Sequence, residues 1–259
     1  MEEPLKMTIE RMKKPSNWAS LLFYEKIRLY AETLTAEHAK YADKLTAKEL
    51  AKERCPDIEI PRVVRILSDY KDFSRSDINP NHILKSAHGS KWNNDFKRSP
   101  NLKAINKRLL YWNQKYKSYS IERHYSFIEP RFFIEEKIED RLLGRTGDAI
   151  VYMVRCVDGV PISLGVKLAN KQNNYNLEWL EYPNCDTHKI PMPIPKPTDL
   201  DKILEYAVRL SAPFEFVRID FYLSPGKIYF SEYTFTPSGG FISFPGNVNL
   251  ERELGDKWL

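Results

Sequence analysis

Apolar residues recur at helical spacing in several segments of the chain. Residues 16–54 carry two apolar stripes, the second of which includes Leu45 and Leu50, and this pattern predicts helix. Cys55-Pro56 ends the segment, because the residue before a proline avoids the α conformation. Further helices are predicted over residues 102–116, from Thr198 or Asp199 to Leu210, and over residues 250–259.

Short runs rich in β-branched and aromatic residues predict strands between these helices. They cover residues 61–67, 82–85, 131–134, 149–157 and 160–168. Residues 86–94 and the proline-rich residues 170–197 show neither periodicity, so we predict that they are irregular. Helices first, followed by strands grouped as antiparallel hairpins, indicate the α+β class rather than strict βαβ alternation.

Residues 216–240 contain the most informative pattern. Two aromatic and β-branched runs flank Ser224-Pro225-Gly226-Lys227, which predicts a β-hairpin. In the first strand Arg218 and Asp220 alternate with apolar residues, and in the second Glu232 and Thr234 share a face. Two carboxylates and an arginine among aromatic residues are unfavourable unless they are paired or bind a ligand. A magnesium ion that bridges phosphates is such a ligand.

The turn decides whether Asp220 and Glu232 can form one site. A two-residue Pro225-Gly226 loop would place these two side chains on opposite faces of the hairpin. A shared metal site therefore requires a loop of odd length or a β-bulge, and a three-residue loop that includes Lys227, with a glycine-assisted bulge, would meet this requirement. Without a ligand, the same residues would form a cross-strand pair of arginine and carboxylate on a partly solvated sheet.

Composition narrows the class of protein. The chain has 259 residues, 42% hydrophobic and 29% charged, which fits one large or two small globular domains. No apolar run approaches the roughly 20 residues of a membrane span, and the first residues have no signal-peptide core. Cys55, Cys156 and Cys185 are far apart, which argues against a disulfide framework or a zinc site. We therefore expect a cytoplasmic protein.

The charge is unevenly distributed. Residues 1–130 contain 25 Lys and Arg against 17 Asp and Glu, a net charge of +8, whereas residues 131–259 contain 15 against 18, a net charge of −3. The excess is greatest in residues 91–117, where Asp95 is the only acidic residue. Nucleic acid, an acidic glycan or nucleotide phosphates could bind there, or the segment could be a solvated helix face.

Two further segments could contribute to a nucleotide site. Lys85 ends a predicted strand and precedes a loop with a single glycine, so its ammonium could neutralise phosphate while backbone N–H groups approach it. The sequence is not a P-loop, and a solvated strand end is the simpler interpretation of this lysine. Residues 135–139 could offer an extended backbone to an adenine edge and a carboxylate to a ribose, or they could be an exposed charged connection. No nucleophile motif or zinc-spaced histidine pair occurs.

These residues together resemble a known family. Arg218-x-Asp220, Glu232-x-Thr234 and Pro237-Ser238-Gly239-Gly240 resemble the C-terminal signature of ATP-grasp enzymes. More closely, the chain resembles the TupA-like ATP-grasp family, named for a protein of teichuronopeptide biosynthesis. The supporting segments are Asp43-Lys44-Leu45, Ile83-Leu84-Lys85, His88-Gly89-Ser90-x-Trp92-Asn93, the approach to Glu135-Glu136, residues 216–241 and Glu253-Leu254-Gly255. The resemblance runs from about residue 43 to 255.

The resemblance implies a role for each matching residue. Lys85 would contact the ATP phosphates, with His88, Gly89 and Ser90 as the small-residue loop over them. Arg218 would stabilise the γ-phosphoryl group or an acyl phosphate. The implied adenine hinge is Glu136, Lys137 and Ile138, with Glu139, or less favourably Asp140, on the ribose. The implied magnesium ligands are Asp220, Glu232 and Thr234.

The sequence departs from the family pattern at several positions, one of which is Lys48, where the family usually carries an arginine. Thr234 replaces the usual asparagine ligand and is a poorer ligand for magnesium, so one metal would be held more loosely. Lys91 replaces a loop glycine, Ala87 replaces an asparagine, and Met153 stands where relatives carry a lysine. These changes leave nucleotide binding in place but bear on the acceptor and on the reaction.

The implied fold is ATP-grasp, with two α+β subdomains that grip ATP behind a small, mainly helical N-terminal region. We expect this helical region at residues 1–80, a lid subdomain at 81–137 and a catalytic subdomain at 138–259. The implied activity is an ATP- and Mg²⁺-dependent ligase that joins a carboxylate to an amine through an acyl phosphate, and the resemblance suggests a uronic acid or amino acid of a cell-surface polysaccharide, such as a capsule or O-antigen precursor.

Two alternatives remain open. The first is a phosphotransferase on the same fold that acts on a sugar or glycan. The second is a non-catalytic module that binds polyanions through the basic half of the chain. The expected partners are ATP, an acidic sugar, nucleotide-sugar or glycan precursor, and an amine or amino acid; nucleic acid is not favoured.

Overall fold

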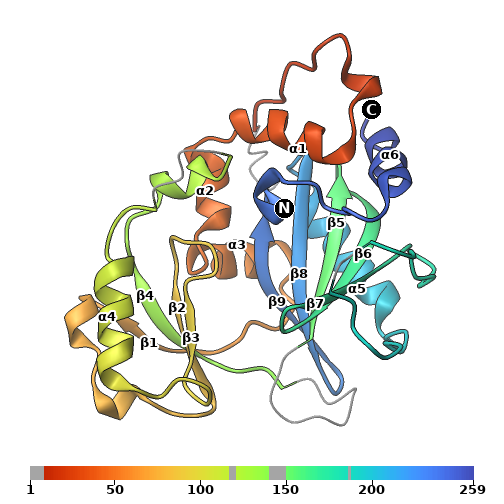
Figure 1. Cartoon of the computed structure of the whole chain (residues 1–259). Coiled ribbons are helices and arrows are strands. Elements are labelled where there is room, and N and C mark those ends of the chain that lie inside the picture. The colour runs from red at the N-terminus through yellow and green to blue at the C-terminus, as the bar shows by residue number, and fades with distance from the viewer. Residues whose placement is uncertain (1–8, 117–120, 140–149, 186–187) are drawn as a thin grey trace.

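The structure of the protein, a computed structural model, describes residues 9–116, 121–139, 150–185 and 188–259. Two antiparallel sheets lie side by side, and helices pack against each of them (Figure 1). This arrangement confirms the predicted α+β class. In the described residues, no helix is both long and apolar enough to cross a bilayer.

The large sheet has five strands in the order β7-β6-β5-β8-β9, and all neighbours are antiparallel. Its centre is β8, which pairs with β5 on one side and with β9 on the other, so residues 216–234 form the predicted hairpin inside the sheet rather than at a free edge. The strands are β5 (Val151–Val157), β6 (Val160–Leu168), β7 (Lys171–Tyr175), β8 (Phe216–Ser224) and β9 (Lys227–Thr234).

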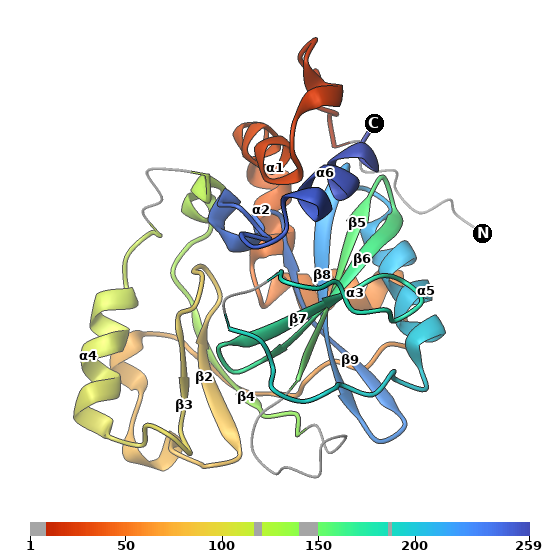
Figure 2. The ribbon, with the colours of Figure 1, turned by 45° about the vertical axis from the view of Figure 1, so that its right-hand side comes forward.

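The small sheet has four strands in the order β1-β4-β2-β3 and is covered by one helix. The helix, α4 (Leu102–Trp112), buries Ile105, Leu109 and Trp112 against apolar residues of the sheet. Figure 2 shows α4 on the side of the small sheet that faces away from the large one. The strands are β1 (Val63–Leu67), β2 (His82–Ser86), β3 (Asn93–Asp95) and β4 (Phe132–Glu136).

The remaining helices share a core with the large sheet. In β8 the alternate residues Val217, Ile219 and Phe221 are buried in this core, which leaves the other face of the strand to the polar residues. The first three helices pack on the large sheet. The strand that follows them in the sequence, β1, belongs to the small sheet. The helices are α1 (Phe23–Glu32), α2 (Ala36–Ala42), α3 (Thr46–Arg54), α5 (Leu200–Ser211) and α6 (Val248–Asp256).

The apolar spacing explains where these helices form. In α1 the buried residues Phe23, Ile27, Tyr30 and Ala31 recur every three or four positions and make one face. The carboxylate of Glu25 accepts a hydrogen bond of 2.7 Å from the Leu22 N–H, which satisfies a donor at the helix start. The predicted helical segment 16–54 is thus three helices with breaks near residues 33–35 and 43–45.

Two predicted loops contain strands. β7 has the sequence Lys-Gln-Asn-Asn-Tyr, in which Tyr175 is the only residue that favours strands, so its pattern gives no strand signal. Tertiary contacts stabilise it instead: the Asn174 side chain accepts a hydrogen bond of 3.1 Å from Arg155, and Asn173 accepts one of 2.9 Å from the Ile190 N–H. The short strand β3 lies in the segment 86–94 and just beyond it, and pairs with β2.

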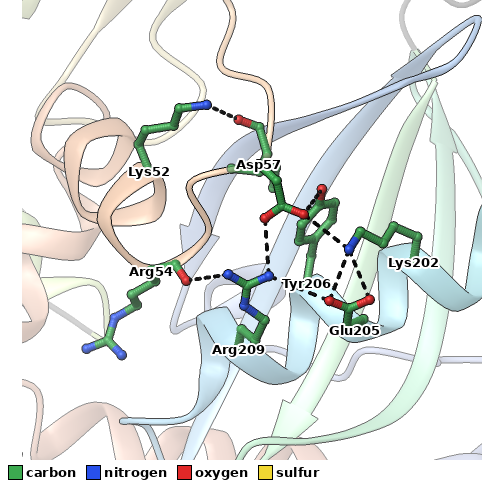
Figure 3. Close-up of polar contacts among 8 residues, drawn as sticks. Lys52, Arg54, Asp57, Lys202, Glu205, Tyr206 and Arg209 are labelled. Atoms are coloured by element: carbon green, nitrogen blue, oxygen red, sulfur yellow. Dashed lines mark hydrogen bonds and ion pairs between the residues drawn. The ribbon is translucent and has the colours of Figure 1, made fainter. Parts of the chain in front are cut away.

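A polar cluster on the surface joins the end of α3 to α5 (Figure 3). The Asp57 carboxylate accepts a hydrogen bond of 3.0 Å from the Tyr206 hydroxyl, and it forms ion pairs with Lys202 at 3.1 Å and Arg209 at 3.2 Å. Arg209 also donates to the carbonyl of Arg54 at 2.9 Å. Hydrogen bonds from Lys202 and Tyr206 hold the pKa of Asp57 at about 2, below its usual value of 3.8.

Asp57→Asn should lower Tm at neutral pH by no more than about 3 °C, because the cluster is exposed to solvent. The depressed pKa of Asp57 means that its stabilising effect is present above pH 3.8 and is lost as the pH falls through about 2. Thermal unfolding of both proteins along this pH range measures the effect. A Tm difference that stays constant below pH 3.8 would contradict the assignment.

Candidate active site

A β-bulge in the central hairpin brings the two key carboxylates together. The loop has two residues, because Ser224 pairs with Lys227 and this register continues to Phe221 and Phe230. The register then shifts, and Asp220 pairs with Glu232, which leaves Ser231 as the extra residue. The requirement for a bulge is confirmed, but the predicted three-residue loop that includes Lys227 is wrong. Gly226, with φ of +69°, serves the tight turn and not the bulge.

Arg218 lies between the two carboxylates. It donates two hydrogen bonds to Asp220, from Nε and from Nη2, each of 2.6 Å. Nη2 lies 3.2 Å from the Thr234 hydroxyl oxygen and 3.7 Å from Glu232 Oε1. The Thr234 hydroxyl in turn donates to Glu232 Oε1 at 3.2 Å. The four polar residues predicted from the hairpin therefore form one connected group on one face of the sheet.

The two carboxylates of this group have pKa values shifted in opposite directions. Burial raises the pKa of Asp220 to about 6, although the charge of Arg218 acts in the opposite direction. Burial also raises the pKa of Glu232, but the positive charges of Lys44, Arg218 and Lys85 outweigh it, and the net pKa lies below the usual value. Both carboxylates are thus held ready to bind a cation near neutral pH, with Glu232 the more strongly ionised.

Lys85 reaches the same region from the small sheet. Its ammonium forms an ion pair with Glu135, a buried residue of β4 that also pairs with Lys48 at 2.9 Å. Burial would lower the pKa of Lys85, but the charge of Glu135 outweighs this effect, so the pKa lies above its usual value. Lys85 therefore stays a cation, and Glu135 fixes its position.

A cavity of about 700 Å³ lies between the two sheets. Ligand sites of small molecules commonly have about this volume. Six of the residues predicted from the sequence line it: Lys85, Ser90, Arg218, Asp220, Glu232 and Thr234. The structure thus brings the strand-end lysine, part of the loop after it and the charged hairpin to one cavity, although Lys85 and Thr234 are 149 positions apart in the sequence.

The loop after Lys85 is held by internal contacts. His88 is completely buried, and its ring lies 2.9 Å from the Trp112 carbonyl oxygen and 2.9 Å from the Ser86 hydroxyl. A Cβ atom at Gly89 would lie 2.6 Å from the Trp92 ring, so this position has no room for a side chain. Neither residue lines the cavity, and their roles toward a nucleotide remain predictions.

The predicted adenine hinge follows β4. The Lys137 N–H donates to the Asn81 carbonyl at 2.9 Å, and its ammonium pairs with Asp95 at 2.7 Å. Glu136 pairs with Arg62 on the surface at 2.5 Å. These two residues, with Ile138 and Glu139, are half-buried and do not line the cavity, and the alternative Asp140 lies outside the described residues. Their assignment to adenine and ribose stays a prediction.

Lys44 is a cation of the site for which the sequence patterns predict no role. It lies in the break between α2 and α3, lines the cavity and donates a hydrogen bond of 2.7 Å to the Gly89 carbonyl. Burial lowers the pKa of its ammonium, and the charge of Glu232 partly opposes the effect. Asp43-Lys44-Leu45 resembles a segment of the family, but only the fold shows that this lysine reaches the hairpin.

The two hairpin carboxylates fit a magnesium ion. In the described part of the chain no group of three or more His, Cys, Asp and Glu side chains could hold a metal ion. Mg²⁺, however, is usually held by one or two carboxylates together with substrate phosphates and water. Asp220 and Glu232 are paired across β8 and β9, line the cavity, and have cationic neighbours that could receive phosphates.

The overall fold is similar to those of several ligases. The D-alanine–D-alanine ligase from Helicobacter pylori matches with a TM-score of 0.48 and 14% identity, over 85% of this chain and 61% of that one. The ATP-grasp ligase PsnB, complexed with a minimal precursor, matches with a TM-score of 0.44 and 16% identity, over 85% of this chain and 60% of that one. This chain therefore spans about three fifths of either protein. No curated protein sequence matches it significantly.

The sequence itself carries the assignment. Residues 25–259 match the family described as TupA-like ATPgrasp, which is most of the chain and includes both sheets and the cavity between them. The match confirms the resemblance inferred from the motifs, and with it the ATP-grasp fold. This chain belongs to the TupA-like ATP-grasp family.

Proposed function

We propose that the chain is an ATP- and magnesium-dependent ligase that joins a carboxylate to an amine. The observation that supports this proposal is the combination, in one cavity, of the carboxylates of the buried Asp220 and the half-buried Glu232 with Arg218 and with two half-buried lysines, Lys44 and Lys85. Phosphoryl transfer requires from a protein mainly positioning and neutralisation of charge. This set of side chains could supply both.

The lining of the cavity suggests how ATP lies in it. Ile83, Val151 and Tyr222 give one end of the cavity an apolar lining, with Lys167 and Gln172 beside them, and this apolar end could receive a purine ring. Lys44 and Lys85 would bind the phosphates, and Asp220 and Glu232 would hold the magnesium ion, with Thr234 beside them. When bound, the ion would neutralise charge on the phosphate oxygens.

Arg218 is the residue best suited to assist the chemistry. A substrate carboxylate oxygen would attack the γ-phosphorus of ATP, the bond to the β-phosphate oxygen would break, and ADP and an acyl phosphate would result. An amine nitrogen would then attack the acyl carbon and lose a proton as phosphate leaves. Arg218 could neutralise the transferred group in both steps, since its guanidinium contacts Asp220 and lies 3.7 Å from Glu232.

A basic hollow beside the cavity suggests that one substrate is acidic. It has a volume of about 460 Å³ and shares Lys91 and Asn93 with the cavity. Arg98 and Arg108 also line it, with Asp95 as the only acidic residue. We therefore propose that the carboxylate substrate is an acidic sugar or acidic precursor of a cell-surface polysaccharide, such as a uronic acid.

Charge reversal at Lys91 and Arg98 should raise the KM for the acidic substrate by about tenfold, because both residues line the hollow. The same change at Lys103 and Lys107 is the control, since these residues are exposed on α4 and line neither the hollow nor the cavity. Steady-state kinetics at low ionic strength measure the difference. Equal effects of the two pairs would show that the hollow has no special role.

Mass spectrometry of the products tests the reaction. The protein is incubated with ATP, magnesium and a panel of uronic acids and amino acids. An amide that requires an amine and appears with free phosphate supports the ligase. A phosphorylated acceptor would instead indicate the phosphotransferase. Polyanion binding that survives Asp220→Asn and Glu232→Gln, without magnesium-dependent binding of ATP, would indicate the non-catalytic module.

A further inference from the structure

The side chains that line the cavity change from apolar to charged along β8. Side chains that face the cavity recur every second residue, as Tyr222, Asp220 and Arg218, with a spacing of roughly 7 Å. Tyr222 belongs to the apolar end and Asp220 to the charged middle. Arg218 stands at the far end of the charged middle, next to Thr234. Under the proposed function ATP fills the first two parts, so what lies beyond Arg218 belongs to another ligand.

An aromatic wall with one carboxylate lies near Arg218, since the positive charge of Arg218 opposes the rise that burial causes in the pKa of Tyr125, one of the rings of this wall. The Trp92 and Tyr116 rings are 5.1 Å apart, and the Tyr116 and Tyr125 rings are 5.3 Å apart, with tilted planes in both pairs. The Tyr116 hydroxyl donates a hydrogen bond of 2.9 Å to Glu122 Oε2. All four residues line the cavity. They come from two segments, the β2–β3 connection and the approach to β4.

The chemistry of this wall suits an ammonium ion. Aromatic faces attract cations, and a carboxylate adds a charge-assisted hydrogen bond. The protein gives an example at the same place, since the Lys44 ammonium lies 5.5 Å from the centre of the Tyr125 ring. Burial, together with Glu122, raises the pKa of Tyr116 to about 12, so its hydroxyl keeps the proton that it donates and orients the carboxylate at neutral pH.

We propose that Glu122, Tyr116 and Trp92 form the subsite that binds the ammonium group of the amine substrate. The proposal rests on the proposed function, because it identifies where the second substrate of that reaction enters. The subsite lies beyond Arg218, at the end of the cavity where the γ-phosphoryl group would be transferred. An amine held there would be next to the acyl phosphate that it attacks.

A reaction with hydroxylamine distinguishes a loss of amine binding from a loss of acyl phosphate formation. At neutral pH hydroxylamine is largely uncharged, so it can trap an acyl phosphate as a hydroxamate without an ammonium site. Glu122→Gln should keep the rate of hydroxamate formation within about twofold, whereas the KM for a charged primary amine should rise by about 10- to 100-fold. The glutamine side chain still offers Tyr116 a carbonyl oxygen, so the local fold should persist. Parallel losses with both nucleophiles, or no loss with the amine, would overturn the proposal.

Binding of a simple cation tests the subsite without turnover. The probes are butylammonium and the uncharged 1-butanol, and saturation-transfer NMR measures their binding to the full chain. We expect butylammonium to bind the wild-type protein more tightly than 1-butanol, and Glu122→Gln to abolish the difference. Glu129→Gln is the matched control, because Glu129 is exposed and pairs with Lys115 on the surface. No preference for the cation, or an equal effect of the control, would overturn the subsite, whereas absence of hydroxamate with every carboxylate would instead count against the ligase.

Discussion

Replacing Asp220 with Asn should reduce ATP-dependent turnover by about 100- to 1,000-fold and should remove the effect of magnesium on nucleotide binding. A metal ion contributes several kcal/mol of charge stabilisation in a phosphoryl transfer site, and asparagine offers it a neutral oxygen in place of an anionic one. Asp220 is buried opposite Glu232 and lines the cavity, and the hairpin has no third carboxylate that could replace either of them. Glu232→Gln should have a similar effect.

Calorimetry with a non-hydrolysable ATP analogue, with and without magnesium, separates loss of the metal from loss of the fold. The control is Asp201→Asn, on the exposed side of α5, which packs on the opposite face of the large sheet. Asparagine at position 220 also removes the charge that Arg218 pairs with, so circular dichroism and Tm should accompany the titration. Magnesium that still strengthens nucleotide binding in both hairpin variants would refute the assignment of the metal ligands.

Replacing Glu135 with Leu should lower the free energy of unfolding by about 3–5 kcal/mol. Glu135 is almost completely buried and pairs with both Lys48 and Lys85. Without it, the ammonium groups of Lys48 and Lys85 would lose the carboxylate with which both of them pair, and a buried charge without a partner is strongly unfavourable. Urea denaturation measures the change, and nucleotide binding should weaken as well, because Lys85 loses the partner that positions it.

The neighbouring residue provides the control. Glu136 pairs with Arg62 on the surface, so Glu136→Gln should change the unfolding free energy by no more than about 1 kcal/mol. Burial raises the pKa of Glu135, but Lys48 and Lys85 outweigh it, and the net pKa lies below the usual 4.5. Its contribution is therefore present above pH 4.5 and is lost as the pH falls below that value. Equal destabilisation by the two substitutions would show that the buried pairs are not special.

Patterns of neighbouring residues gave most of the elements. The helical spacing of Leu200, Ile203, Ala207 and Leu210 and the alternation in β8 are local signals, and both elements form where they were predicted. β7 was missed because its polar residues are stabilised by contacts with distant side chains, which no local pattern records. The breaks near residues 33–35 and 43–45 were not predicted for a related reason. The helices change direction there and remain in contact with the large sheet.

The candidate site also combines residues that local patterns predict with residues that only long-range contacts bring together. Residue types and spacing singled out Lys85, Arg218, Asp220, Glu232 and Thr234, because charges within aromatic strands are unfavourable without a partner or a ligand. Lys44, Glu122 and Tyr116 could not be found in this way, since a lysine at a helix break and a glutamate near a tyrosine are common on any surface. Only the packing of α2 and α3 against the large sheet, and of the small sheet beside it, brings them to the cavity.

The sequence by itself determined that Asp220 and Glu232 had to share a face if they were to bind one ion, because strand residues alternate between faces with a period of two. It did not determine how. A two-residue loop is the favoured connection at Pro225-Gly226, and that loop alone would have turned Glu232 toward the core. The tertiary structure decided the matter with a bulge at Ser231, where one extra residue restores the register. Bulges depend on the packing of both faces of a sheet, and a linear sequence does not specify where that packing will accommodate one.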